Sequence, residues 1–326
     1  MRIKPLIIIL GEPYSTFQEI IFKTYKLSIF SKLRNPIVIV GSLKLFKKQM
    51  IKLKYNFKIN EISKDEIGTK KLNNNVINFV NVDFKFKNTF DKITTNSKNY
   101  INACFKLAIE KAKKNKLTGI INGPVSKKHF LEKKFIGVTE YLAAKTKIKQ
   151  EPTMLIYNPV FSVCPVTTHL PINQVSKKLS KKKIINDVNN INKYFKKYLN
   201  KKPKFAVLGL NPHCETTNKK SEEKLVIEPA INRLKKNKII IKGPFSADTF
   251  FSNKNLSYFD VAIGMYHDQV LTPMKTIFKF DAINLTLGLP FIRVSPDHGT
   301  NNQMIGEKKS NPKSLVSCIH FFKKIK

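Results

Sequence analysis

Tryptophan is absent from this sequence of 326 residues, and cysteine, glycine and arginine are scarce. The four cysteines, Cys104, Cys164, Cys214 and Cys318, lie far apart and form no C-x-x-C motif. A chain of this length buries a core large enough to fold without disulfides. We therefore expect reduced, buried thiols and a cytoplasmic protein, and the class of small disulfide-stapled secreted domains is excluded.

Long apolar runs are also missing. The first one, Leu6–Leu10, has five residues, whereas a membrane-spanning helix needs about 20. It is equally too short for the apolar region of a secretory signal and is typical of a first β-strand. The sequence therefore predicts no membrane partner.

Acidic residues are few, with 22 against 60 basic ones, which gives a formal net charge of +38. Such a charge favours anionic partners and leaves open a basic nucleic-acid-binding protein as a remote alternative. Only four basic residues are arginine, however, and base-edge recognition depends on the arginine fork. We interpret the dispersed lysines as solvated surface and expect no specific nucleic-acid partner.

Neither G-x-G-x-x-G nor a P-loop occurs, and no repeat or linker divides the chain. Short apolar runs instead alternate with lysine-rich stretches of helical spacing, such as 100–114 and 184–199. Each apolar run is followed by Gly, Asn, Thr or Tyr. The runs are 6–10, 37–40, 119–121, 161–166, 205–210 and 261–265. This alternation predicts the α/β class, with a mainly parallel sheet and ligands at the carboxyl ends of its strands.

Three of the six histidines, His169, His213 and His267, follow such runs. The carboxyl ends of parallel strands share one edge of a sheet, and neutral imidazole is the commonest ligand of zinc and similar ions. One interpretation is a divalent-metal site assembled from three strands, with Cys214 as a possible soft ligand. The other is three independent loop residues or helix caps, and the spacing alone leaves both open.

Further polar residues follow the third histidine. Lysine and arginine in this stretch have the chemistry to bind carboxylate or phosphate. The candidates are Asp268, Lys275, Asn284, Arg293 and the run Asp297, His298, Gly299 and Thr300.

Taken in order, seven motifs resemble the 4-hydroxythreonine-4-phosphate dehydrogenase family of pyridoxal 5′-phosphate biosynthesis. They are GPVSK at 123–127, GVTE at 137–140, TTHLP at 167–171, GLNPH at 209–213, GPFSADT at 243–249, YHDQ at 266–269 and NLTLGLPFIR at 284–293. The resemblance extends from Gly11 to about Ser314.

The resemblance implies a fold of two α/β/α domains like that of isocitrate and isopropylmalate dehydrogenases, with the active-site cleft between them. Residues 1–134 with 286–326 would form the first domain, on the dinucleotide side, and 135–285 the central one, with the metal ligands and dimer contacts. The family works as a homodimer with a shared active site. It uses NAD or NADP and one divalent ion (zinc, magnesium or cobalt).

The same resemblance implies roles for individual residues. His169, His213 and His267 would bind the metal, with one of them supplied across the dimer. The phosphorylated substrate would contact Thr139, Lys275, Asn284 and Arg293, and the dinucleotide would contact Asp297, His298, Gly299 and Thr300. Lys275, Asp248 and Asp268 would be catalytic, the two aspartates by orienting ligands or relaying a proton.

The implied reaction is oxidation of 4-phosphooxy-L-threonine to 2-amino-3-oxo-4-(phosphooxy)butanoate, which decarboxylates to 3-amino-2-oxopropyl phosphate. One departure bears on it: Val138 stands where the family has a histidine, and valine can neither donate a hydrogen bond nor carry charge. A sister dehydrogenase acting on threonate or erythronate 4-phosphate is therefore the alternative, and a decayed enzyme would have the same histidines without turnover.

Overall fold

The computed structural model describes residues 3–132, 134–214, 217–279 and 281–325. By its internal contacts the chain divides into two compact units. Unit 1 comprises 1–149 and 289–324, and unit 2 comprises 150–288 with the last two residues. The domain boundaries expected from the sequence, 134/135 and 285/286, stay a prediction.

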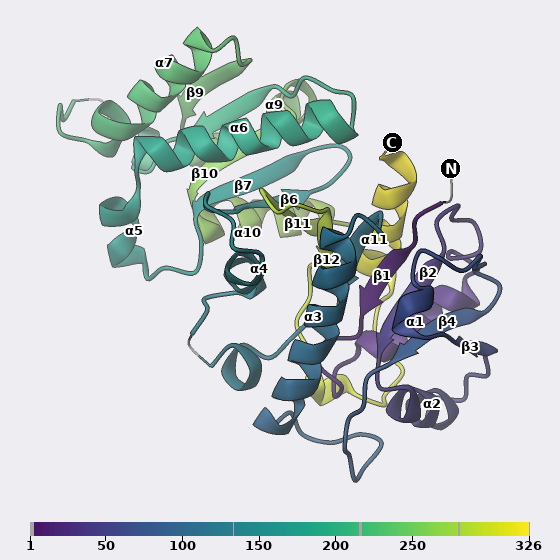
Figure 1. Ribbon diagram of the computed structural model, residues 1–326. Helices are drawn as coiled ribbons and strands as arrows, with labels where there is room; N and C mark the ends of the chain where they lie inside the picture. The colour runs from purple at the N-terminus through teal and green to yellow at the C-terminus, as the bar shows by residue number, and fades with distance from the viewer. Residues whose placement is uncertain (1–2, 133, 215–216, 280, 326) are drawn as a thin grey trace. The chain divides into compact units, whose positions relative to one another are not determined.

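Unit 1 is built on strands in the order β3-β4-β2-β1-β5-β12, whose pairings are parallel. The strands are β1 (Leu6–Ile9), β2 (Ile37–Gly41), β3 (Ile59–Glu61), β4 (Ile77–Asn81), β5 (Gly119–Asn122) and β12 (Arg293–Pro296). The helices are α1 (Phe17–Lys26), α2 (Leu43–Lys52), α3 (Lys98–Lys113), α4 (Val138–Thr146) and α11 (Lys313–Lys324) (Figure 1).

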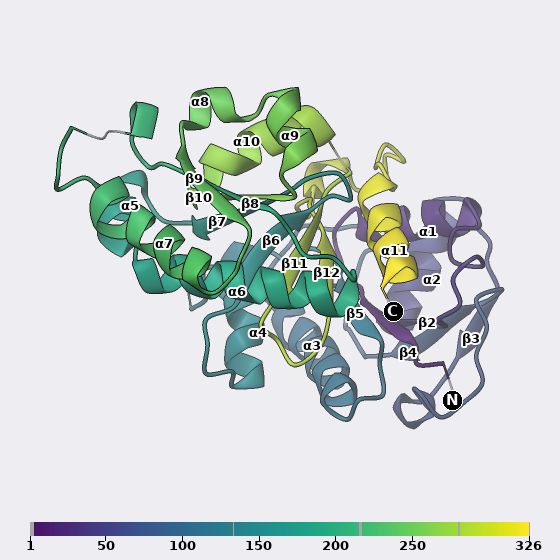
Figure 2. The ribbon, with the colours of Figure 1, turned by 90° about the horizontal axis from the view of Figure 1, so that it is seen from above.

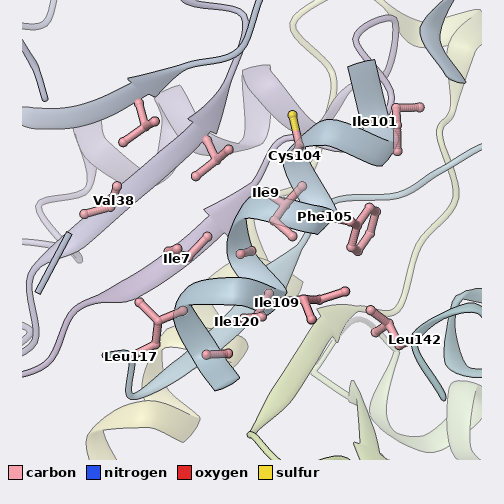
Figure 3. Packing of buried hydrophobic residues seen from close by; sticks show 14 of the residues in the cluster. Ile7, Ile9, Val38, Ile101, Cys104, Phe105, Ile109, Leu117, Ile120 and Leu142 are labelled. Atoms are coloured by element: carbon pink, nitrogen blue, oxygen red, sulfur yellow. The ribbon is translucent and has the colours of Figure 1, made fainter. Parts of the chain in front are cut away.

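Both faces of this sheet are covered, as an all-parallel sheet requires. Alternate strand residues such as Ile7, Val38 and Ile120 pack against α3, where Phe105 contributes a fully buried ring (Figure 3). On the opposite face, rings of α1 and α2 meet a ring of β4 through Phe22–Phe46 and Phe46–Phe79 contacts. Every residue of β1 is buried, which explains its unbroken apolar sequence.

Unit 2 has strands in the order β11-β6-β7-β10-β8-β9. The β11–β6 and β6–β7 pairings are antiparallel and the others parallel. Its strands are β6 (Thr153–Tyr157), β7 (Ser162–Thr167), β8 (Phe205–Leu208), β9 (Ile241–Phe245), β10 (Val261–Tyr266) and β11 (Ile283–Leu287). Its helices are α5 (Ile172–Lys178), α6 (Lys181–Tyr198), α7 (Glu228–Lys236), α8 (Ala247–Phe250), α9 (Asn253–Tyr258) and α10 (His267–Phe278).

The strands of unit 2 are also sandwiched between helices, with α6 along one face and α8, α9 and α10 on the other (Figure 2). Val270 and Met274 of α10 pack on Val163 of β7 in one apolar cluster. Toward α6, the Asp187 carboxylate is fully buried and accepts hydrogen bonds from Lys183 (2.7 Å) and Thr153 (2.6 Å). The expected α/β class and mainly parallel pairing are thus confirmed.

Short turns complete the fold: 3₁₀ segments at 64–66, 95–97, 212–214 and 302–304, and π-helical turns at 127–131 and 223–227. The four cysteines are free and buried, as expected. In the described part of the chain, no helix is long and apolar enough to span a membrane.

Candidate functional site

The three histidines follow three neighbouring strands of unit 2. His169 comes two residues after β7, His267 directly after β10, and His213 lies in the turn after β8. These strands are adjacent in the order β7-β10-β8 and run parallel. All three histidines therefore emerge at the same edge of the sheet, as the sequence predicts for a ligand site.

His169 and His267 form a close pair, with ring centroids 5.6 Å apart. The Nδ1 atom of His267 lies 2.6 Å from the Asp268 carboxylate. Because a carboxylate only accepts, Nδ1 is the donor in this contact, and in the neutral ring Nε2 is the electron-pair donor. A carboxylate on the far nitrogen of a metal-binding histidine fixes the ring in this way. The pair therefore fits a divalent cation in donor chemistry.

His213 lies close enough to Asp248 to act on its pKa. Its backbone is left-handed (φ 54°). A hydrogen bond from the Ser246 hydroxyl holds the pKa of Asp248 below its usual value, helped by the Thr249 amide and by charge on His213. Across the described residues of this single chain, no three His, Cys, Asp or Glu side chains are close enough to hold a metal ion. The close imidazole pair found among these residues is His169 with His267.

The thiol of Cys214 is buried against Gly209, where an added Cβ would lie 2.8 Å from the sulfur. Burial raises the pKa of this thiol, so the thiolate that a metal would bind is disfavoured.

Two of the expected substrate residues lie in unit 2. Lys275 is exposed in the last turn of α10. Asn284 pairs with Ile156 between β11 and β6, and its buried Oδ1 atom has no hydrogen-bond partner among the described residues. An unpaired buried acceptor costs free energy and is often completed by a ligand or water.

The other two, Thr139 and Arg293, lie in unit 1 and are buried. Arg293 begins β12, is 3% exposed and donates from Nε to the Asn122 side chain at 2.7 Å. Burial lowers the pKa of Arg293 to about 10, so the group stays cationic at neutral pH. Sequence reasoning missed Asn122, although it ends β5 just before the Gly-Pro turn. Val138 packs against the apolar cluster of unit 1, as a valine should.

The run from Asp297 to Thr300 is anchored to unit 1 by its backbone. The Asp297 amide donates to Ser314 Oγ (2.9 Å), and the Thr300 carbonyl accepts from the Thr16 amide (3.1 Å). His298 donates from Nδ1 to the Gly299 carbonyl (2.9 Å).

Burial lowers the pKa of His298, which keeps the ring neutral at neutral pH. Its buried Nε2 has no hydrogen-bond partner within the described ranges. The neutral ring therefore presents an acceptor for a ligand hydroxyl.

A basic cavity of about 460 Å³ in unit 1 is connected to Asn302, two residues after this run. Asn302 donates to the carbonyls of Tyr14 and Asp91 (both 3.3 Å), and both of these residues line the cavity. Its lysines are Lys85, Lys87 and Lys92. The arrangement suits an anionic ligand held beside residues 297–302.

Glu12 is a further residue that sequence reasoning passed over. It follows β1 in a Gly-Glu-Pro turn and is fully buried. Burial raises its pKa to about 7, while Ser97 and the Ser126 backbone act in the opposite direction. A charged residue in the tight Gly-Glu-Pro turn that follows the apolar run 6–10 was the available signal.

The sequence and the fold were compared with those of known proteins, and the matches name the same enzyme family. The family model of the pyridoxal phosphate biosynthetic protein PdxA matches residues 32–322. The 4-hydroxythreonine-4-phosphate dehydrogenase of Sulfurihydrogenibium sp. is 36% identical over 324 residues, 96% of each chain.

Solved structures share the fold. The 4-hydroxythreonine-4-phosphate dehydrogenase from Klebsiella pneumoniae has a TM-score of 0.82 at 23% identity over 98% of each chain. Isocitrate dehydrogenase from Methylococcus capsulatus has a TM-score of 0.51 at 8% identity, over 98% of this chain and 85% of that one. The expected dehydrogenase fold is confirmed, and the chain belongs to the PdxA family of pyridoxal phosphate biosynthetic proteins, as its motifs indicate.

Proposed function

We propose that this protein oxidises 4-phosphooxy-L-threonine with NAD or NADP in a metal-dependent reaction. The product is 2-amino-3-oxo-4-(phosphooxy)butanoate, which loses carbon dioxide to give 3-amino-2-oxopropyl phosphate. The observation that carries the proposal is the His169–His267 pair, at the strand edge that also bears His213, in a chain of this family.

His169, His213 and His267 would hold the divalent ion (zinc, magnesium or cobalt). When bound, such an ion supplies Lewis acidity toward a hydroxyl or carbonyl oxygen. Because one chain presents a pair, the natural source of the third ligand is His213 of a second copy, in a homodimer.

The substrate's anionic groups would be held by the cations Arg293 and Lys275. Thr139 offers a hydroxyl, and the unpartnered Oδ1 of Asn284 accepts a hydrogen bond from the substrate's ammonium or hydroxyl group. Lys275 is also the candidate for handling the hydroxyl proton. Asp268 orients His267, and Asp248, beside His213, orients a ligand or relays the proton.

The dinucleotide would lie along Asp297, His298, Gly299 and Thr300. The Nε2 acceptor of His298 suits a ribose hydroxyl, and the lysines of the adjacent cavity suit the phosphates. A cytoplasmic location agrees with the four free, buried cysteines.

The test is formation of reduced nicotinamide, followed by absorbance, from 4-phosphooxy-L-threonine with each dinucleotide. Threonate and erythronate 4-phosphates are measured in parallel because Val138 replaces the family's histidine. Preferred turnover of the threonine phosphate, lost with a chelator, supports the proposal. Faster turnover of another phosphate, or none with any of them, overturns it.

A further inference from the structure

The strand ends that carry the histidines are tied together by side chains of unit 2. Thr167, the last residue of β7, donates from its hydroxyl to the Met265 carbonyl of β10 at 2.7 Å. Gln269 accepts from the Met265 amide at 2.7 Å and donates to the Gly209 carbonyl, just after β8, at 2.7 Å. Three neighbouring strands are thereby connected at the edge where His169, His213 and His267 emerge.

Of these side chains, Gln269 uses both the oxygen and the nitrogen of its amide, one as an acceptor and the other as a donor. Its oxygen closes the first turn of α10 back onto the strand end, one residue further than a capping box does. Its nitrogen crosses to the chain segment that leads to His213. A carboxylate has only acceptors and would face the Gly209 carbonyl oxygen unfavourably, so glutamate cannot replace the amide.

One glycine makes room for this bridge. A Cβ on Gly264 would lie 3.1 Å from the Gln269 Oε1 atom and 2.3 Å from a methyl group of Val270. The glycine in β10 therefore leaves the space in which the Gln269 side chain lies.

The segment between Gly209 and His213 is fixed from its other side as well. Glu223 is fully buried and accepts from the amides of Leu210 (2.8 Å) and Asn211 (2.9 Å). Glu223 therefore holds the backbone at 210–211, and Gln269 holds the carbonyl of Gly209, on the segment that leads to His213.

We propose that Gln269 is a positioning residue, which sets the spacing between the histidines that this chain contributes to metal binding. This role of Gln269 rests on the proposed metal-binding function. Gln269 itself binds no ligand and acts through the backbone at Met265 and Gly209. The Gln269 bridge has the same role if one of the three histidines binds the metal ion of a second copy. It then fixes that histidine relative to the two that bind the ion in this chain.

The test compares Gln269→Glu with Gln174→Glu, the same change at an exposed position of α5. Metal-free protein is titrated with zinc by calorimetry and with cobalt by visible absorption. We expect Gln269→Glu to weaken zinc binding about 10-fold, as loss of an outer-shell partner does. We also expect it to change the cobalt bands, which report coordination geometry. Gln174→Glu should match the wild type in both measurements.

Circular dichroism establishes that each variant is folded. If Gln269→Glu does not fold, Gln269→Met replaces it, because methionine removes both hydrogen bonds without adding charge. If the wild type binds metal and the Gln269 variant binds it equally with an unchanged cobalt spectrum, the positioning role is wrong while the proposed function stands. If the wild type binds neither ion, the metal part of the proposed function fails and this inference with it.

Discussion

Replacing the buried Glu12 by glutamine should make the protein's stability less sensitive to pH. The Glu12 carboxyl is inaccessible to water, and burial raises its pKa from 4.5 to about 7. The unfolded chain therefore ionises this group at a lower pH than the folded chain does. Its contribution to stability is present below pH 4.5 and is lost as the pH rises through about 7.

The size of the effect follows from the shift. Each pKa unit corresponds to about 1.36 kcal/mol, so the free energy of unfolding should fall by about 3 kcal/mol between the two pKa values. Glutamine has the same shape and no charge, and it removes this fall. His298, whose pKa is lowered by burial, acts in the opposite direction, but it is common to both proteins and cancels in their difference.

Guanidinium unfolding followed by circular dichroism suits this test, because the chain has no tryptophan to report by fluorescence. The free energies of wild type and Glu12→Gln are compared at about pH 5 and about pH 8.5, on either side of the shifted pKa. Glu61→Gln, at an exposed position of β3, is the matched control and should keep the wild-type dependence. A constant difference between wild type and Glu12→Gln at the two pH values would refute the reasoning.

Three other substitutions test the packing and the site. Asp187→Asn should lower the free energy of unfolding by about 3 kcal/mol, because it removes the nearest counter-charge of the mostly buried Lys183 ammonium and leaves only Glu151 at 4.0 Å. Denaturant midpoints measure this, and an unchanged midpoint would contradict it. Arg293→Lys keeps a cation but loses the bond to Asn122, so KM for the phosphorylated substrate should rise about 10-fold, more than kcat falls. His169→Ala should abolish tight zinc binding in calorimetry, and retained affinity would exclude this ligand.

Much of the fold could be predicted from local patterns. Runs such as 37–40 and 261–265 are apolar throughout because both faces of the sheet are covered, and each lies within a strand of the structure. The antiparallel strands β6 and β11 were not identified from the sequence. Their pairing depends on contacts between residues 153–157 and 283–287, which no local pattern reveals.

The candidate site was predictable in composition and only partly in geometry. That His169 and His267 follow strands could be seen directly, and the sheet order then brings their rings together. The left-handed turn at His213 and its position beside Asp248 depend on tertiary contacts, which spacing does not encode. The bridging role of Gln269 was equally invisible, because both of its partners are backbone groups.

The most direct test of the proposed function is a metal titration of turnover. Protein stripped by a chelator and dialysed is supplied with increasing zinc or cobalt, while reduced nicotinamide formed from 4-phosphooxy-L-threonine is followed. The histidine site predicts no turnover in the stripped protein and a rise that saturates at one ion per chain, absent when both His169 and His267 are replaced by alanine. Full turnover in the stripped protein would contradict it.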